Sequence, residues 1–447
     1  MNWFKSEAED FIERYPNIDY IDLIFTDVNG TPRGKRIPVD GLNKVGKGIY
    51  LPVSTNSLDN KGGVVEEAGL GELIGEPDNL CFPVQGSLRP SVTDNVGQLL
   101  LTMMDSEGKQ PTPYAARNVL SSLLAKLHAK NIFPVVALEL EFYLIDKNRD
   151  AVGELQTAIN PSKKRRDSSC EVYNIEDLDD YSAFLSDVNV HAKAQGINTS
   201  GALSESAPGQ FEINFNHSQD LLGACDQIIL TKRLIKQIAH KHNFDATFMA
   251  KPFQNEAGNG KHIHLSIVNQ QGKNLFSNED GQASPMFYQT IAAMLAQIPE
   301  SMALLCPNVN SYRRFVPGTF TPLLADWACN HRGVALRIPE SDANNRRIEH
   351  RIAGADVNPY TLSSVILSSL LASDTFSPEL CPAPLNPDAI KIPTRMSDAL
   401  DNLHKSELSS YLPKEFLSMY LSCKSNELAE FERIVTPIET TWMLHSA

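Results

Sequence analysis

The sequence predicts an α+β protein with two domains, a small β-rich domain over residues 1–106 and a larger domain over residues 107–447. The chain has 447 residues, which is more than one ordinary hydrophobic core holds. Short strand-like segments and glycine-rich loops fill roughly the first 100 residues. Beyond them, helical segments alternate with short strands, which is typical of a mixed α+β domain.

In the small domain, residues 20–38 predict a β-hairpin. Apolar residues alternate before the turn residues 27–30 (Asp-Val-Asn-Gly), and a second strand follows. Residues 97–105 predict another strand, and the glycine-rich stretch 62–75 predicts loops.

In the large domain, helical patterns with terminal signals predict the main helices, at 111–130, 177–196, 218–242, 282–305 and 424–435. Pro113 is expected in the first turn of its helix, because proline is tolerated there. Gly196 is expected to close the second helix. Ser397 is the candidate N-cap for a further helix over 398–406.

Composition excludes several classes of function. The formal net charge of −14 argues against nucleic-acid binding, which depends on basic surfaces. No run of about 18 apolar residues is present, so we expect no membrane partner. The seven cysteines are scattered without metal spacing, and the first 16 residues lack the pattern of a signal peptide. A reducing, cytoplasmic location is the expectation.

The strand-like stretch 135–144 carries two carboxylates on one face. Alternate residues of a strand share a side, about 7 Å apart, so Glu139, Glu141 and Tyr143 lie together. This face is either the solvated side of a sheet or a functional site. The solvated side is the usual explanation for any single strand.

Four further segments repeat this pattern and favour a site. One face of each carries acidic, imidazole or guanidinium groups: Glu212 and Asn214; His262, His264 and Ser266; Arg337; Arg347, Glu349 and Arg351. Glutamate is depleted in strands, and like charges on one face repel unless cations lie between them. Carboxylates with an imidazole suit Mg²⁺ or Mn²⁺, and arginines suit phosphate. Together they indicate phosphoryl transfer without a P-loop, whose sequence is absent.

Six ordered motifs resemble those of the glutamine synthetase superfamily, over nearly the whole chain. They are ALELEF (137–142), ESAPGQFE (205–212), AGNGKHIHLS (257–266), NSYRRFVPG (310–318), NHRGVALRIP (330–339) and RRIEHR (346–351). The resemblance implies a β-grasp-like N-terminal domain and a catalytic domain around a curved antiparallel sheet. It also implies a homo-oligomer, a dodecamer of two stacked rings, with each active site between one subunit's large domain and a neighbour's small domain.

The resemblance assigns a role to each motif residue. Glu141, Glu205 and Glu212 would hold one divalent ion near glutamate, and Glu139, His262 and Glu349 would hold another near the ATP phosphates. Glutamate would be bound by Gly258, Arg314 and Arg351. The nucleotide would be bound by His264, Ser266, Arg332, Arg337 and Arg347, with Arg332 and Glu349 acting in catalysis.

Two departures from the family pattern fall where ammonia is bound. Phe320 stands where ammonia-using members carry a glutamate, and Pro52 stands where they carry an aspartate. A phenyl ring can neither attract ammonium nor accept its proton, but it can line a site for a carbon chain. We therefore expect a ligase that joins glutamate to putrescine or another alkylamine through γ-glutamyl phosphate, as in the γ-glutamylputrescine synthetase branch. The alternatives are an ammonia-using glutamine synthetase and a catalytically inactive relative.

Overall fold

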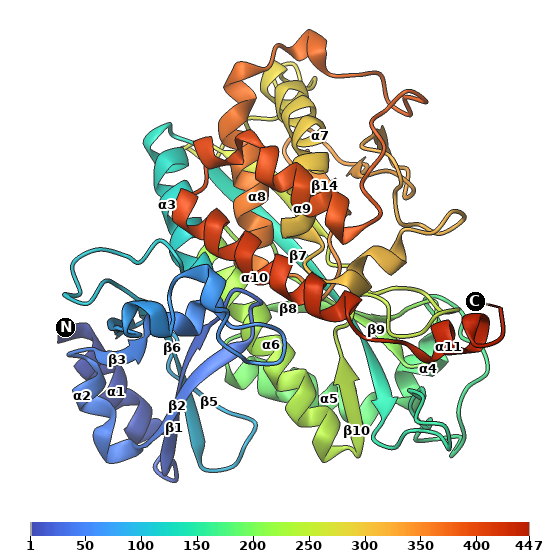
Figure 1. Ribbon diagram of the computed structural model, residues 1–447. Coiled ribbons are helices and arrows are strands. Elements are labelled where there is room, and N and C mark those ends of the chain that lie inside the picture. Colours follow the sequence, from blue (N-terminus) through green and yellow to red (C-terminus); the bar gives the residue numbers. More distant parts are fainter. Residues whose placement is uncertain (1, 447) are drawn as a thin grey trace.

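The computed structural model describes residues 2–446, which contain two β-sheets (Figure 1). The small sheet has the strand order β2-β1-β6-β4-β3, with β5 paired to β6. Its strands are β1 (Tyr20–Thr26), β2 (Pro32–Pro38), β3 (Ile49–Pro52), β4 (Asp78–Pro83), β5 (Arg89–Pro90) and β6 (Val96–Met103). The predicted hairpin is present, with Tyr20 opposite Pro38, and Gly30 adopts the left-handed conformation that its turn requires.

The small sheet packs on the first helix. Helix α1 (Asn2–Arg14) buries Phe4, Ala8 and Phe11 against apolar residues of β1 and β6, including Ile21 and Leu99. The short helix α2 (Leu42–Val45) adds its two terminal side chains to this core. Figure 1 shows these elements together at one end of the molecule.

The large sheet carries the predicted site segments. Its order is β12-β13-β14-β11-β7-β9-β8, with β10 paired to β7, and only β12 and β13 run parallel within it. The strands are β7 (Phe133–Asp146), β8 (Thr199–Ser204), β9 (Gln210–Phe215), β10 (Phe244–Thr247), β11 (Ile263–Val268), β12 (Trp327–Cys329), β13 (Leu336–Ile338) and β14 (Ile348–His350). The sheet is therefore antiparallel around the predicted site, as the family resemblance implies.

Helices cover the apolar face of this sheet. Leu138, Leu140 and Phe142 of β7 are fully buried in one core with side chains of helices α3, α6, α7 and α8. The helices are α3 (Ala116–Ala129), α4 (Ile175–Asp180), α5 (Ser182–Ala194), α6 (Leu221–Lys241), α7 (Pro285–Leu305), α8 (Pro359–Ala372), α9 (Met396–Lys405), α10 (Lys414–Glu432) and α11 (Pro437–Met443). The opposite face is left free for polar side chains. No helix of residues 2–446 has the length and hydropathy that crossing a membrane requires.

Several predicted helix boundaries are wrong, and the helix predicted over 424–435 is the second half of α10, which begins at Lys414. Pro113 lies in a turn that precedes α3, where Asn118 Nδ2 donates a hydrogen bond to the Thr112 carbonyl. The helix predicted over 177–196 breaks at Tyr181, whose ring packs against Phe211. Ser397 lies inside α9, since the helix already begins at Met396, which is buried.

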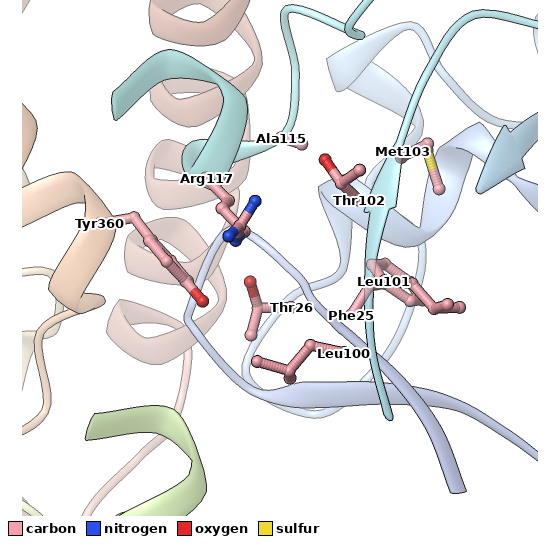
Figure 2. Close-up of a pocket in the computed structure, with 9 residues that line it drawn as sticks. All are labelled: Phe25, Thr26, Leu100, Leu101, Thr102, Met103, Ala115, Arg117 and Tyr360. Atoms are coloured by element: carbon pink, nitrogen blue, oxygen red, sulfur yellow. The ribbon is translucent and has the colours of Figure 1, made fainter. Parts of the chain in front are cut away.

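A largely buried ion pair joins helices α3 and α6 beside the small sheet. Arg117 of α3 donates twice to Asp226 of α6, at 2.9 Å each, and the Tyr360 hydroxyl donates to the same carboxylate at 2.5 Å. Figure 2 shows Arg117 and Tyr360 beside β1 and β6, around a cavity of about 20 Å³. That volume holds about one water molecule, so this cavity is not a substrate site. The proposed boundary at residue 106 falls between β6 and α3 and stays a prediction.

Candidate active site

Four adjacent strands bring the acidic side chains together. Glu139 and Glu141 lie on the polar face of β7, and Glu141 is directly opposite Glu212 of β9. On the other side of β7, the Glu139 amide donates to the carbonyl of His262, which precedes β11. Glu349 of β14 is directly opposite His264 of β11. The antiparallel register thus places residues far apart in sequence on one face of the sheet.

Two overlapping groups of side chains have the arrangement of metal ligands. In Glu139, His262 and Glu349, one potential ligand atom from each lies within 4.8 Å of the others. Glu141, Glu212 and His262 form the second group by the same measure. The first group coincides with one predicted set. The second contains His262 where Glu205 was expected.

Glu205 lies beside these groups and interacts with them electrostatically. Burial raises the pKa of Glu205 to about 8, with further contributions from the charges of Glu141 and Glu139. Burial also raises the pKa of Glu212 to about 10, again with Glu139 and Glu141 contributing. Without cations, Glu205 and Glu212 therefore favour the protonated form.

Glu139 and Glu349 are shifted in the opposite direction. Burial acts to raise the pKa of Glu139, but hydrogen bonds from His262 Nδ1 at 2.7 Å and His264 Nε2 at 3.0 Å hold it well below its usual range. For Glu349, burial is outweighed by the positive charges of His262 and Arg351, which lower its pKa. Carboxylates that stay ionised beside an imidazole suit a divalent cation, so the donor set fits Mg²⁺ or Mn²⁺.

A cavity of about 440 Å³ adjoins the first group. Its wall includes Glu139 and three residues predicted to bind nucleotide, His264, Arg337 and Arg347. Arg337 Nε and His264 Nδ1 are buried and have no hydrogen-bond partner within residues 2–446.

Sequence reasoning missed part of this wall. Ser200 and Gly201 also line the cavity. They lie on β8, where the register with β9 shifts between Thr199 and Gly201. The sequence signal for these two residues was the run of small residues at 199–202, on the strand beside the one that carries Glu212.

Two predicted nucleotide residues lie outside the cavity wall. Ser266 is half-buried on β11, and Arg332 is exposed on the turn between β12 and β13. The Arg332 carbonyl accepts a hydrogen bond from Arg351 Nε at 3.2 Å. The charge of Arg332 acts to lower the pKa of Glu205, although burial outweighs it.

The predicted glutamate residues lie around a tightly packed loop. Arg314 is buried, and its Nη1 donates to the Ile352 carbonyl at 2.9 Å. A Cβ at Gly258 would lie 2.7 Å from Arg314 Cγ, so only glycine fits there. Gly260, which sequence reasoning did not assign, donates its amide to Glu141 at 2.7 Å. Arg351 donates to Glu349 and therefore contacts the metal-ligand groups directly.

Side chains from the sheet fix this loop. The Tyr143 hydroxyl donates to the Ala257 carbonyl at 2.7 Å, so Tyr143 does more than pack. Gln210 Nε2 donates to the Gly258 carbonyl and to Asn259 Oδ1, both at 3.1 Å. Lys251 donates to the Glu256 carbonyl. Gln210 was missed as a site residue, although its glycine–glutamine motif was recognised.

Comparison with known proteins identifies the family. The family described as glutamine synthetase, catalytic domain, matches residues 113–443. The γ-glutamylputrescine synthetase PuuA of Escherichia coli (strain K12) is 46% identical, over 99% of this chain and 95% of that protein. The chain belongs to the glutamine synthetase family.

Other members of the glutamine synthetase family resemble the chain over its whole length. The glutamate–isopropylamine ligase of a Pseudomonas species is 29% identical, over 96% of this chain and 95% of that protein. The solved structure described as a GmaS/ADP complex superposes with a TM-score of 0.84 at 26% identity, covering 98% of this chain and 99% of that one. ATP and divalent metal ions are used generally in this family, in agreement with the cavity and the two ligand groups.

The two residues predicted for the amine site lie on different parts of the fold. Phe320 lies on a loop and its side chain is 72% exposed. Pro52 lies on β3 of the small sheet, opposite Asp78. The role of both residues in binding an amine stays a prediction.

Proposed function

We propose that this protein is an ATP-dependent glutamate–amine ligase that joins the γ-carboxylate of L-glutamate to putrescine or a similar alkylamine. One observation carries the proposal: two overlapping groups of metal ligands adjoin a cavity of nucleotide size, while the ammonia-binding glutamate is replaced by Phe320. The names of the relatives support it, since they include synthetases of γ-glutamylputrescine and γ-glutamylethanolamide and an isopropylamine ligase.

In the first step, the γ-carboxylate of glutamate attacks the γ-phosphate of ATP, ADP leaves, and γ-glutamyl phosphate forms. Glu139, His262 and Glu349 would hold one Mg²⁺ or Mn²⁺, and Glu141, Glu205 and Glu212 another, with His262 close enough to contribute to both. The ions would neutralise charge on the phosphates. Arg337 and Arg347 line the cavity and would orient these phosphates. Arg314 and the loop at Gly258 would orient glutamate.

In the second step, the amine attacks the acyl carbon and phosphate leaves. A carboxylate at position 320 would bind ammonium, whereas the phenyl ring of Phe320 offers apolar surface to the methylene chain of an alkylamine. The ring is exposed in the single chain, which leaves it free to contact such a substrate.

We also propose that the amine site is completed by a second copy of the chain, within a dodecamer of two stacked rings. The exposure of Phe320 supports this assembly, because in it the small sheet of a partner subunit, which carries Pro52, could approach Phe320. Size measurement by light scattering tests it. A monomer that is fully active at assay concentration would contradict it.

Ammonia-using glutamine synthetase is the second candidate, because relatives with that name are 29–30% identical over 78–80% of the chain. Mass spectrometry of reaction products separates the two. The protein is incubated with ATP, Mg²⁺ and glutamate, and with either putrescine or ammonium. We expect γ-glutamylputrescine as the main product. Glutamine alone, with no diamine product, would establish the second candidate.

A further inference from the structure

Arg337 is held from two sides at the wall of the 440 Å³ cavity. Its Nη1 donates to Glu349 Oε2 at 2.7 Å, across the β13–β14 pair. Its Nη2 donates to Asn330 Oδ1 at 3.1 Å. The third nitrogen, Nε, is buried without a partner in residues 2–446. Asn330 belongs to none of the predicted metal, glutamate or nucleotide sites.

The backbone conformation of Asn330 places its side chain near Arg337. The residue directly follows β12, and its amide donates to the Ile338 carbonyl of β13 at 2.9 Å. Its φ of 48° lies in the left-handed region, which most side chains avoid and asparagine tolerates. The chain therefore leaves the sheet at Asn330 with the amide oxygen turned toward Arg337.

We infer that Asn330 is a positioning residue that keeps Arg337 directed at the nucleotide phosphates during turnover. The inference rests on the proposed function, in which Glu349 is a metal ligand. When Glu349 binds a cation, its hold on Arg337 weakens, since the same carboxylate then serves two positive charges. Asn330 is neutral and does not compete for the ion. The hydrogen bond from Arg337 to Asn330 therefore remains when the Glu349 carboxylate binds both the cation and Arg337.

Substitutions at position 330 distinguish the effect of the side-chain amide from the effect of the left-handed backbone. Asn330→Gly keeps the left-handed conformation but removes the amide, whereas Asn330→Asp keeps an acceptor oxygen. Asn243→Gly is the matched control, because Asn243 is also left-handed, with φ 64°, and follows α6 away from the cavity. Thermal melting confirms that each variant is folded.

The experiment measures ADP binding by calorimetry with saturating Mn²⁺, together with the KM for ATP. We expect Asn330→Gly to weaken ADP binding about 10- to 150-fold, as the loss of one hydrogen bond to a charged group predicts. We expect Asn330→Asp to stay within about 3-fold of wild type, as the retained acceptor predicts, and Asn243→Gly to bind as wild type.

Coupling to Arg337 distinguishes positioning from a structural effect. In an Arg337→Ala background, Asn330→Gly should weaken ADP binding no further, because the two residues act through one contact. Wild-type binding by Asn330→Gly, or full additivity with Arg337→Ala, would overturn the inference. Binding of ADP requires no amine, so this result stands even if no amine is a substrate and the proposed function fails.

Discussion

Glu349 accepts a hydrogen bond from Arg337 at 2.7 Å and lies directly opposite it across β13 and β14. Arg351 donates to the same carboxylate, which is buried. The Glu349 carboxylate thus binds Arg337 of the predicted phosphate site and Arg351 of the predicted glutamate site. The same carboxylate also belongs to a group of potential metal ligands.

The first prediction concerns this carboxylate. Glu349→Gln keeps the shape of the side chain but removes the charge that binds the ion and both arginines. We expect ATP turnover to fall at least about 100-fold and Mn²⁺ binding to weaken. Phosphate release and Mn²⁺ titration measure these effects. Glu340→Gln, on an exposed residue of the same segment, serves as the control. Near-normal turnover in Glu349→Gln would remove Glu349 from the site.

Glu205 and Glu212 should make the metal-free protein less stable as the pH rises. Their pKa values are raised from 4.5 to about 8 and about 10, so each group binds more protons in the folded chain than in the unfolded chain at a pH between 4.5 and its raised value. Their contribution to the free energy of unfolding therefore falls with increasing pH, whereas buried Lys261, with its lowered pKa, contributes in the opposite direction. Melting temperatures of wild type and Glu212→Gln from pH 6 to 9 in EDTA isolate the contribution of Glu212, and the wild-type value should fall relative to the variant as the pH rises. A difference between the two proteins that does not change with pH would contradict the account.

Lys261 gives a separate prediction about stability. Its side chain is fully buried, its Nζ has no hydrogen-bond partner in residues 2–446, and burial holds its pKa well below the usual range. Lys261→Met should raise the free energy of unfolding by about 1–3 kcal/mol, since an unsatisfied polar group is removed.

The pH dependence of this gain can be checked. The unfolded chain binds a proton at Lys261 that the folded chain excludes, so the gain should grow as the pH falls from 10 to 7. Denaturant unfolding of both proteins measures it. Lys405→Met, at an exposed position, should change little. A destabilised Lys261→Met would show that the amine has a partner it needs.

Sequence periodicity predicted the strands of the site well because their faces alternate strictly. Glu139 and Glu141 on one side of β7, with Leu138 and Leu140 buried on the other, follow directly from the two-residue repeat. The family resemblance then supplied the ligand sets, of which Glu139, His262 and Glu349 lie close enough together to share an ion.

The remaining features depend on tertiary packing. The break of the predicted helix at Tyr181 comes from contacts with Phe211 on another strand. Ser200 and Gly201 reach the cavity through a register shift in β8 that no local pattern indicates. The place of Glu205 outside the second ligand group likewise depends on how its loop packs.

Phe320 should control the choice of amine. Phe320→Glu restores a carboxylate where ammonia-using members carry one, so we expect the preference for alkylamine over ammonium to fall about 10-fold or more. Phe320→Leu keeps an apolar side chain and should preserve the wild-type preference. Kinetics with both amines measure the effect. An unchanged preference in Phe320→Glu would show that specificity resides elsewhere.

Amine specificity in the wild-type protein tests the central claim most directly. The measurement is kcat/KM for putrescine and for ammonium, from phosphate released with saturating ATP, Mg²⁺ and glutamate. We predict a value for putrescine at least about 100-fold above that for ammonium, as a site built for a carbon chain requires. A higher value for ammonium, or no release with any amine, would contradict the assignment as a glutamate–amine ligase.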